Sequence, residues 1–147
     1  MSRLLIKQIS ILSAIFGAIL GILSLIPFIR NFTSVAVMIF MAPIVIIYLK
    51  KLNILHDITV QTGMIMGAIT GIVSIIAFTL AFTPFDLLFS LFIKDGFIFI
   101  MSSFIKNAGI FNYVMLLSFM CILSGITNAF SGLTTAYIYD FLGKIKD

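Results

Sequence analysis

The residues best suited to chemistry are hydroxyl and amide side chains in an apolar stretch near the C-terminus. They follow one another at spacings of four, three and four residues, which places them on one face of a helix: Ser124, Asn128, Ser131 and Thr135. Burial of Asn128 costs the most free energy of the four, because its amide needs several hydrogen-bond partners in an environment without water. Two roles stay open. The side chains either form hydrogen bonds between helices or to their own helix, or they line a polar groove that a solute passes.

Groups for acid–base, metal or redox chemistry are scarce. The chain has no Glu, one His and one Cys. Four of its aspartates lie in connections or near the ends of apolar stretches, namely Asp57, Asp86, Asp95 and Asp140. Proton-coupled transporters usually place an ionisable group well inside a span, and this sequence shows none there. We therefore expect neither an enzyme nor a cofactor or metal site.

The composition is that of a membrane protein. Hydrophobic residues make up 62% of the chain and charged residues 10%, against about 25% charged residues in a soluble protein. The mean hydropathy is +1.28. Four long runs carry no charge, at 8–29, 31–49, 58–85 and 107–139. Since about 20 apolar residues cross a bilayer core as a helix, each run reaches or approaches the length of a span.

These runs predict the architecture. In lipid, backbone groups must form hydrogen bonds within their own segment, so the runs should be helices. We predict an all-α fold, an integral membrane four-helix bundle that forms one domain over residues 1–147. Its spans are expected at about 5–29, 32–49, 58–82 and 108–142.

The connection between the third and fourth spans, about 84–106, differs from the others. Thr83 and Pro84 look like a helix start, with an acidic residue three positions after the Thr. Asp86, Ser90 and Lys94 then form a narrow polar stripe on an apolar helix. This pattern predicts a short amphipathic helix at the membrane surface. A re-entrant segment and an extension of the third span are the alternatives.

Glycines recur every fourth residue in two of the runs. Gly63, Gly67 and Gly71 share one face of the third span, with Ser74 following. Matching positions of the first span hold Ser13, Gly17, Gly21 and Ser24. Small residues at this spacing let neighbouring helix backbones approach closely in lipid. We expect spans one and three to pack through these faces, with each other or with spans two and four. The alternative is that one face forms a homodimer.

The same region suggests an internal repeat. Residues 15–33 match residues 65–83 at 11 of 19 positions, with both glycines and the serine in register. An offset that covers two spans would give a parallel repeat. Duplication of a two-helix unit is therefore a hypothesis.

Pro43 lies inside the second span. It removes one backbone donor, which predicts a kink. The kink is either a plain packing feature or a hinge.

The basic residues predict the orientation. With four spans, one side carries Arg3, Lys7, Lys50, Lys51, Lys144 and Lys146, and the other carries Arg30, Lys94 and Lys106. Cytoplasmic sides carry the excess of Lys and Arg, so both termini are expected in the cytoplasm of a multi-pass cell-membrane protein. The net charge of +4 is spread over span ends, and we expect no nucleic-acid partner.

These features favour a non-enzymatic membrane component, an accessory or assembly subunit. We expect it to contact the lipid bilayer. Further copies of the chain, in a homo-oligomer, or a larger membrane complex are its other candidate partners. The alternative is a small oligomeric transporter or channel for an uncharged or weakly polar solute, lined by the polar face of the fourth span.

Overall fold

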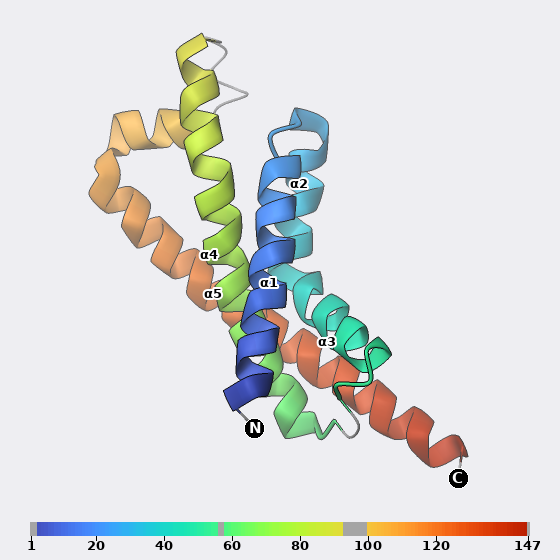
Figure 1. The fold of residues 1–147 in the computed structure, drawn as a ribbon. Helices are drawn as coiled ribbons and strands as arrows, with labels where there is room; N and C mark the ends of the chain where they lie inside the picture. Colours follow the sequence, from blue (N-terminus) through green and yellow to red (C-terminus); the bar gives the residue numbers. More distant parts are fainter. Residues whose placement is uncertain (1–2, 56–57, 93–99, 147) are drawn as a thin grey trace.

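Long apolar helices make up the chain. The computed structural model describes residues 3–55, 58–92 and 100–146. The elements follow in the order α1 (Arg3–Leu23), α2 (Pro27–Val35), the π-helical turn η1 (Ala36–Phe40), α3 (Met41–Lys51), α4 (Val60–Phe92) and α5 (Ile100–Lys146) (Figure 1). Within these described residues the fold is all-α, as predicted. Four segments are long and apolar enough to cross a membrane: Arg3–Leu23, Phe28–Lys51, Val60–Phe89 and Ile105–Leu142.

Helix α4 lies between α1 and α5 (Figure 1). It runs parallel to α1, since Gly17 lies opposite Ser74 and Gly21 lies opposite Phe78. A Cβ atom added at Gly17 would lie 2.3 Å from the Ser74 carbonyl oxygen. The glycines of α1 therefore permit a backbone approach that any side chain would prevent.

The glycines of α4 face α5, which runs antiparallel to it. A Cβ atom added at Gly67 would lie 2.1 Å from the Asn128 carbonyl oxygen, and one added at Gly71 would lie 2.3 Å from that of Ser124. On α5, Gly132 is equally close to the backbone of Gly63. The two glycine faces thus do not meet each other, and both are covered within the chain.

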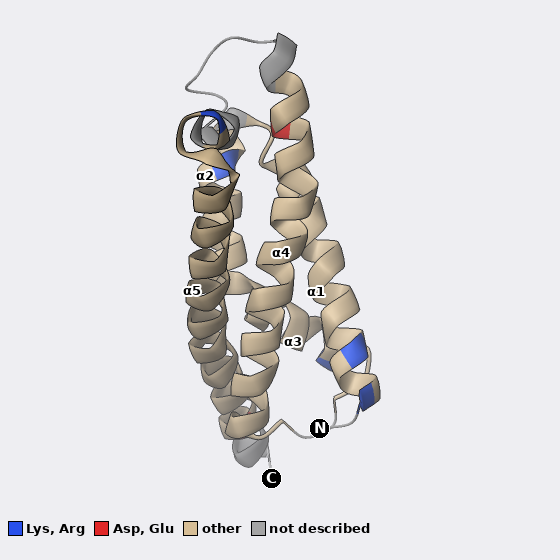
Figure 2. Cartoon of the chain, turned by 90° about the vertical axis from the view of Figure 1, so that its left-hand side faces the viewer, with Lys and Arg blue, Asp and Glu red and all other residues tan. Residues whose placement is uncertain are grey.

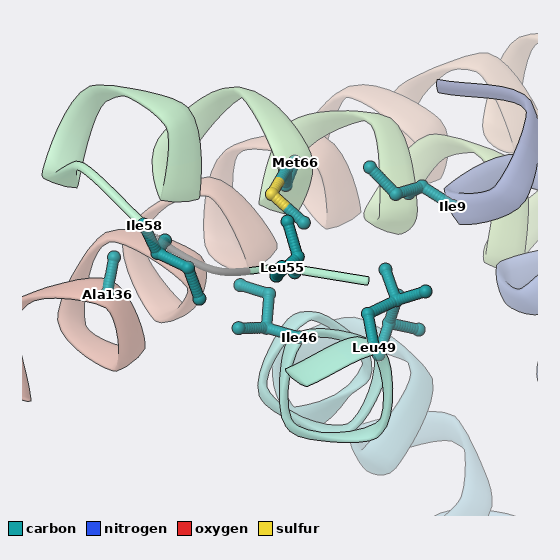
Figure 3. Packing of buried hydrophobic residues seen from close by; sticks show 8 residues of the cluster. Ile9, Ile46, Leu49, Leu55, Ile58, Met66 and Ala136 are labelled. Atoms are coloured by element: carbon teal, nitrogen blue, oxygen red, sulfur yellow. The ribbon is translucent and has the colours of Figure 1, made fainter. Parts of the chain in front are cut away.

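Apolar side chains fill the end of the bundle where both termini lie (Figure 1). The cluster draws on α1, α3, α4, α5 and the connection before α4, and contains Ile9, Val45, Ile46, Leu49, Leu55, Ile58, Met66 and Ala136 (Figure 3). A second cluster beyond it contains Val37, Met41, Ile75, Phe78 and Phe82. These contacts fix α3 against the pair formed by α1 and α4.

The second span is interrupted before Pro43, where the sequence predicts a kink. The π-helical turn η1 separates α2 from α3, and the two helices point in different directions (Figure 1). Phe40 at the junction has φ −100° and ψ −2°. A π-turn and a proline are both recognised causes of helix kinks, and here they are adjacent.

The prediction of a new helix start at Thr83 and Pro84 is wrong. Helix α4 continues through Pro84 to Phe92. The Thr83 hydroxyl, expected to cap a helix, instead forms a hydrogen bond of 2.6 Å with the Tyr113 hydroxyl. Proline at a helix start and proline inside a helix look alike in sequence, and here a neighbouring helix binds the hydroxyl that the cap would use. Residues 84–92 therefore extend the third long helix.

The remainder of the predicted surface segment is described in part. Residues 93–99, with Lys94 and Asp95, lie outside the described residues, as does the turn at His56 and Asp57. Helix α5 is interrupted at Gly109, which has φ 80° and ψ 163°. The short piece before Gly109 lies crosswise to the long piece after it (Figure 1). The long piece begins where the fourth span was expected to begin.

The glycine contacts make a direct prediction about stability. Gly67→Ala should lower the unfolding free energy by roughly 1–3 kcal/mol, because the added methyl meets the α5 backbone, which no rotamer change can move. Thermal unfolding in detergent, followed by circular dichroism, measures the change.

Gly125→Ala is the matched control. Its added Cβ would meet the Ile72 side chain at 3.0 Å, and that side chain can shift. An equal loss of stability in the two variants would contradict the backbone contact at Gly67.

Candidate functional site

The amide of Asn128 lies at the centre of the bundle, where α5 meets η1. Its Oδ1 accepts a hydrogen bond of 2.9 Å from the Ala42 N–H. Its Nδ2 lies 2.9 Å from the Met38 carbonyl oxygen and 3.1 Å from that of Val37. In a regular α-helix the Ala42 N–H would bind the Met38 carbonyl directly. The Asn128 amide therefore contacts both groups that this backbone bond would join.

The sequence of this segment explains why its helix is irregular there. Pro43 has no N–H, so the α-helical pattern is already interrupted one residue after Ala42. A π-turn precedes it and shifts the backbone register by one residue. The Thr127 hydroxyl, next to Asn128 on α5, also donates to the Met38 carbonyl. Two consecutive residues of α5, Thr127 and Asn128, therefore form hydrogen bonds to the backbone of this segment.

Ser124 connects the same region to α4. Its hydroxyl donates a hydrogen bond of 3.0 Å to the Gly71 carbonyl, and Asn128 Nδ2 lies 3.0 Å from the Ser124 carbonyl. Ser124 and Asn128 are both fully buried. These side chains hold α4, α5 and η1 together where the backbones are closest.

The other two predicted groove residues have a different environment. The Thr135 hydroxyl donates to the Ser131 carbonyl of its own helix, at 2.8 Å. Ser131 and Thr135 border an open groove on the outside of the bundle, beside Pro43. The groove is also lined by Ile39, Phe40, Thr127, Phe130 and Thr134. Ser124 and Asn128 thus bind groups of neighbouring helices, whereas Ser131 and Thr135 line this groove.

A second polar contact lies at the far end of the bundle, where the sequence placed separate surface charges. Arg30 Nη2 lies 3.9 Å from Asp86 Oδ1, and Arg30 Nε donates to the Ser24 carbonyl at 3.2 Å. The Asp86 side chain is 1% exposed and the Arg30 side chain 14% exposed. The Arg30 guanidinium also lies over the Phe82 ring. Spacing gives no signal for this pair, because it joins α2 to α4, 56 residues later.

Charged residues are otherwise confined to the ends. Figure 2 shows Lys, Arg, Asp and Glu of the described residues at the two ends of the bundle, with an uncharged middle. Among those residues there is also no group of three or more His, Cys, Asp or Glu side chains that could hold a metal ion. The buried polar groups in the middle are hydroxyls and one amide. Most of them form hydrogen bonds, whereas the buried Thr70 hydroxyl has no hydrogen-bond partner among the described residues.

Comparison of the chain with protein-family models, with curated proteins and with solved structures finds no match.

The Asn128 bridge predicts an energetic coupling across helices. Asn128→Leu should lower the unfolding free energy by about 1–3 kcal/mol, because the Ala42 N–H loses the Asn128 oxygen and the Met38 carbonyl keeps only the Thr127 hydroxyl. Adding Pro43→Ala should reduce that cost, since a regular second span can bind its own backbone. A double-mutant cycle, measured by thermal unfolding in detergent, gives the coupling between the two positions.

Thr134→Val is the control, because the Thr134 hydroxyl is exposed and binds its own helix at Phe130. Its effect should stay within about 0.5 kcal/mol, as for surface changes in general. Strictly additive effects of Asn128→Leu and Pro43→Ala would show that the amide does not compensate for the interrupted helix.

Proposed function

We propose that this protein is a non-enzymatic component of a cell membrane, a small helical subunit with an assembly or accessory role. The observation that carries the proposal is the use of the Asn128 amide. It is the most polar group in the middle of the bundle, and all its contacts are with backbone or with Ser124. A side chain committed in this way stabilises helix packing and is not available to a substrate.

The surface supports insertion into a bilayer. Large apolar side chains are exposed along α5, including Phe111, Phe119 and Phe130. Charged side chains are absent from the middle of the described helices (Figure 2). Water would disfavour such a surface, whereas lipid tails or an apolar partner surface would cover it. The long exposed face of α5 is the part most suited to contact with lipid or with further subunits.

The positions of the two chain ends support an even number of membrane crossings. Both termini lie at the same end of the bundle (Figure 1), together with Arg3, Lys7, Lys50 and Lys51. We place this end in the cytoplasm, because basic residues are enriched on that side of membrane proteins.

Reporter fusions test this orientation. A fluorescent protein that matures only in the cytoplasm should be bright when it is fused after Asp147, and alkaline phosphatase at the same position should be inactive. The control fusion is placed after Arg30, where the pattern should reverse. Active phosphatase after Asp147 would contradict a cytoplasmic C-terminus.

The second candidate function is a small oligomeric transporter or channel. The groove beside Pro43 favours it, because Thr127, Ser131 and Thr135 line it. It is open on the outside of the bundle, so a closed path for a solute would require a second copy or another subunit against it.

Permeability separates the two functions. Proteoliposomes of the purified protein should shrink and re-swell in glycerol or urea at the rate of empty liposomes, because the accessory function provides no pathway. Stopped-flow light scattering measures this rate. Faster swelling that Ser131→Leu abolishes, while Thr79→Val leaves it unchanged, would favour the channel.

A further inference from the structure

A cavity lies between α2, η1, α4 and α5, on the far side of the Asn128 contact from the termini. Helix α5 diverges from α4 beyond their glycine contact (Figure 1), and the cavity occupies part of the space between them. Its volume is about 150 Å³. The walls are mainly apolar, with Met38 from η1, Phe78 from α4, and Leu117 and Met120 from α5.

The size and lining of the cavity indicate the class of ligand. Apolar cavities of about 150 Å³ stay dry and bind molecules of the size of benzene. A dry void also leaves its lining without contacts on one side, which costs dispersion energy. An apolar group of about six carbon atoms would restore these contacts.

Three polar residues border the cavity, and two of them use their hydroxyl hydrogens within their own helices. The Ser34 hydroxyl donates to the Arg30 carbonyl at 2.9 Å, and the Thr79 hydroxyl donates to the Ile75 carbonyl at 2.8 Å. The third, Tyr113, shares a hydrogen bond of 2.6 Å with Thr83. Two hydroxyls in one bond use one of their two hydrogens. The pair therefore keeps one O–H that can donate to a ligand.

We propose that this cavity is a binding site for a small uncharged amphiphile, with a hydrocarbon part of about six carbons and one oxygen that accepts a hydrogen bond. The hydrocarbon lies against Met38, Leu117 and Met120. The oxygen lies at the Thr83–Tyr113 hydroxyl pair. The described residues that line the cavity carry no charge, and Arg30 and Asp86 form an ion pair with each other. The site adjoins the Asn128 contact through Met38 and shares no lining residue with the groove beside Pro43.

Methionine methyl groups provide the readout. Protein labelled with ¹³C at the methionine methyl positions is titrated in detergent with 1-hexanol and, separately, with hexane. The signals of Met38 and Met120 should shift in a saturable way with 1-hexanol. The signal of Met115, whose side chain is 66% exposed, should show no saturable shift and reports partition into the micelle. Equal or unsaturable shifts at all three would overturn the proposal.

Two variants test the apolar part of the site. Ser34→Leu places a larger side chain in the cavity and should abolish the saturable shifts. Ser118→Leu makes the same change at an exposed position whose hydroxyl binds Val114, and binding should persist. If Ser34→Leu does not fold, Thr79→Leu fills the cavity from α4 instead. Undiminished binding in a folded, filled variant would contradict the site.

Tyr113→Phe tests the polar part. It removes one member of the hydroxyl pair, and the remaining Thr83 hydroxyl can turn to its own helix. Affinity for 1-hexanol should fall about fivefold, the effect of one hydrogen bond, with affinity for hexane unchanged. Tyr137→Phe, at an exposed position, is the control. An equal loss for both ligands would show that Tyr113 acts through packing alone.

Discussion

A backbone hydrogen bond that is interrupted in an apolar environment must find another partner, and the centre of this bundle is arranged around that requirement. Segment 28–51 departs from the regular α-helical pattern at η1 and Pro43, and the Asn128 amide binds the Ala42 N–H and the Met38 carbonyl there. The amide can reach this point because α5 lies close to α4. That closeness depends on Gly67, which contacts the backbone of Asn128 itself. The close packing of α4 on α5 at Gly67 and the hydrogen bonds from Asn128 to the backbone are therefore parts of one contact.

The same contact explains the difference between the two ends of the bundle. Toward the termini, Gly63 and Gly132 keep α4 and α5 close, and apolar residues from α1 and α3 fill the remaining space. Away from the termini, α5 carries large side chains such as Leu117 and diverges from α4. That end is held by longer side chains, through the Arg30–Asp86 and Thr83–Tyr113 contacts. A buried ion pair recovers little net free energy after desolvation, so its main effect there is to fix α2 against α4.

Much of this fold follows from the sequence, and the parts that do not have physical reasons. Long uncharged runs predict the helices, and Pro43 predicts the kink. Both signals are local, because the length of a run and the missing N–H of a proline depend only on the residues of that segment. Partners across helices are not local. Asn128 was expected to bind glycine faces or its own helix, and its Nδ2 does contact the Ser124 carbonyl of α5. Its other backbone partners are in η1 and at Ala42, and no spacing rule encodes those contacts. Pro84 was interpreted as a helix start because local sequence cannot show that Tyr113 binds the Thr83 hydroxyl. Asp86 was placed at a membrane surface for the same reason, since its pairing with Arg30 depends on the fold.

The distribution of hydrogen bonds argues for packing over conduction at the polar face of α5. A path for a polar solute needs side chains that can exchange partners with it. Ser124, Thr127 and Asn128 bind backbone groups of other helices, and releasing them would expose the open ends of the second span. Thr134 and Thr135 bind their own helix and can rotate at small cost, but they border a groove that no other part of the described chain covers. Conduction along α5 would therefore depend on a second subunit, whereas packing depends on contacts that a single chain already makes.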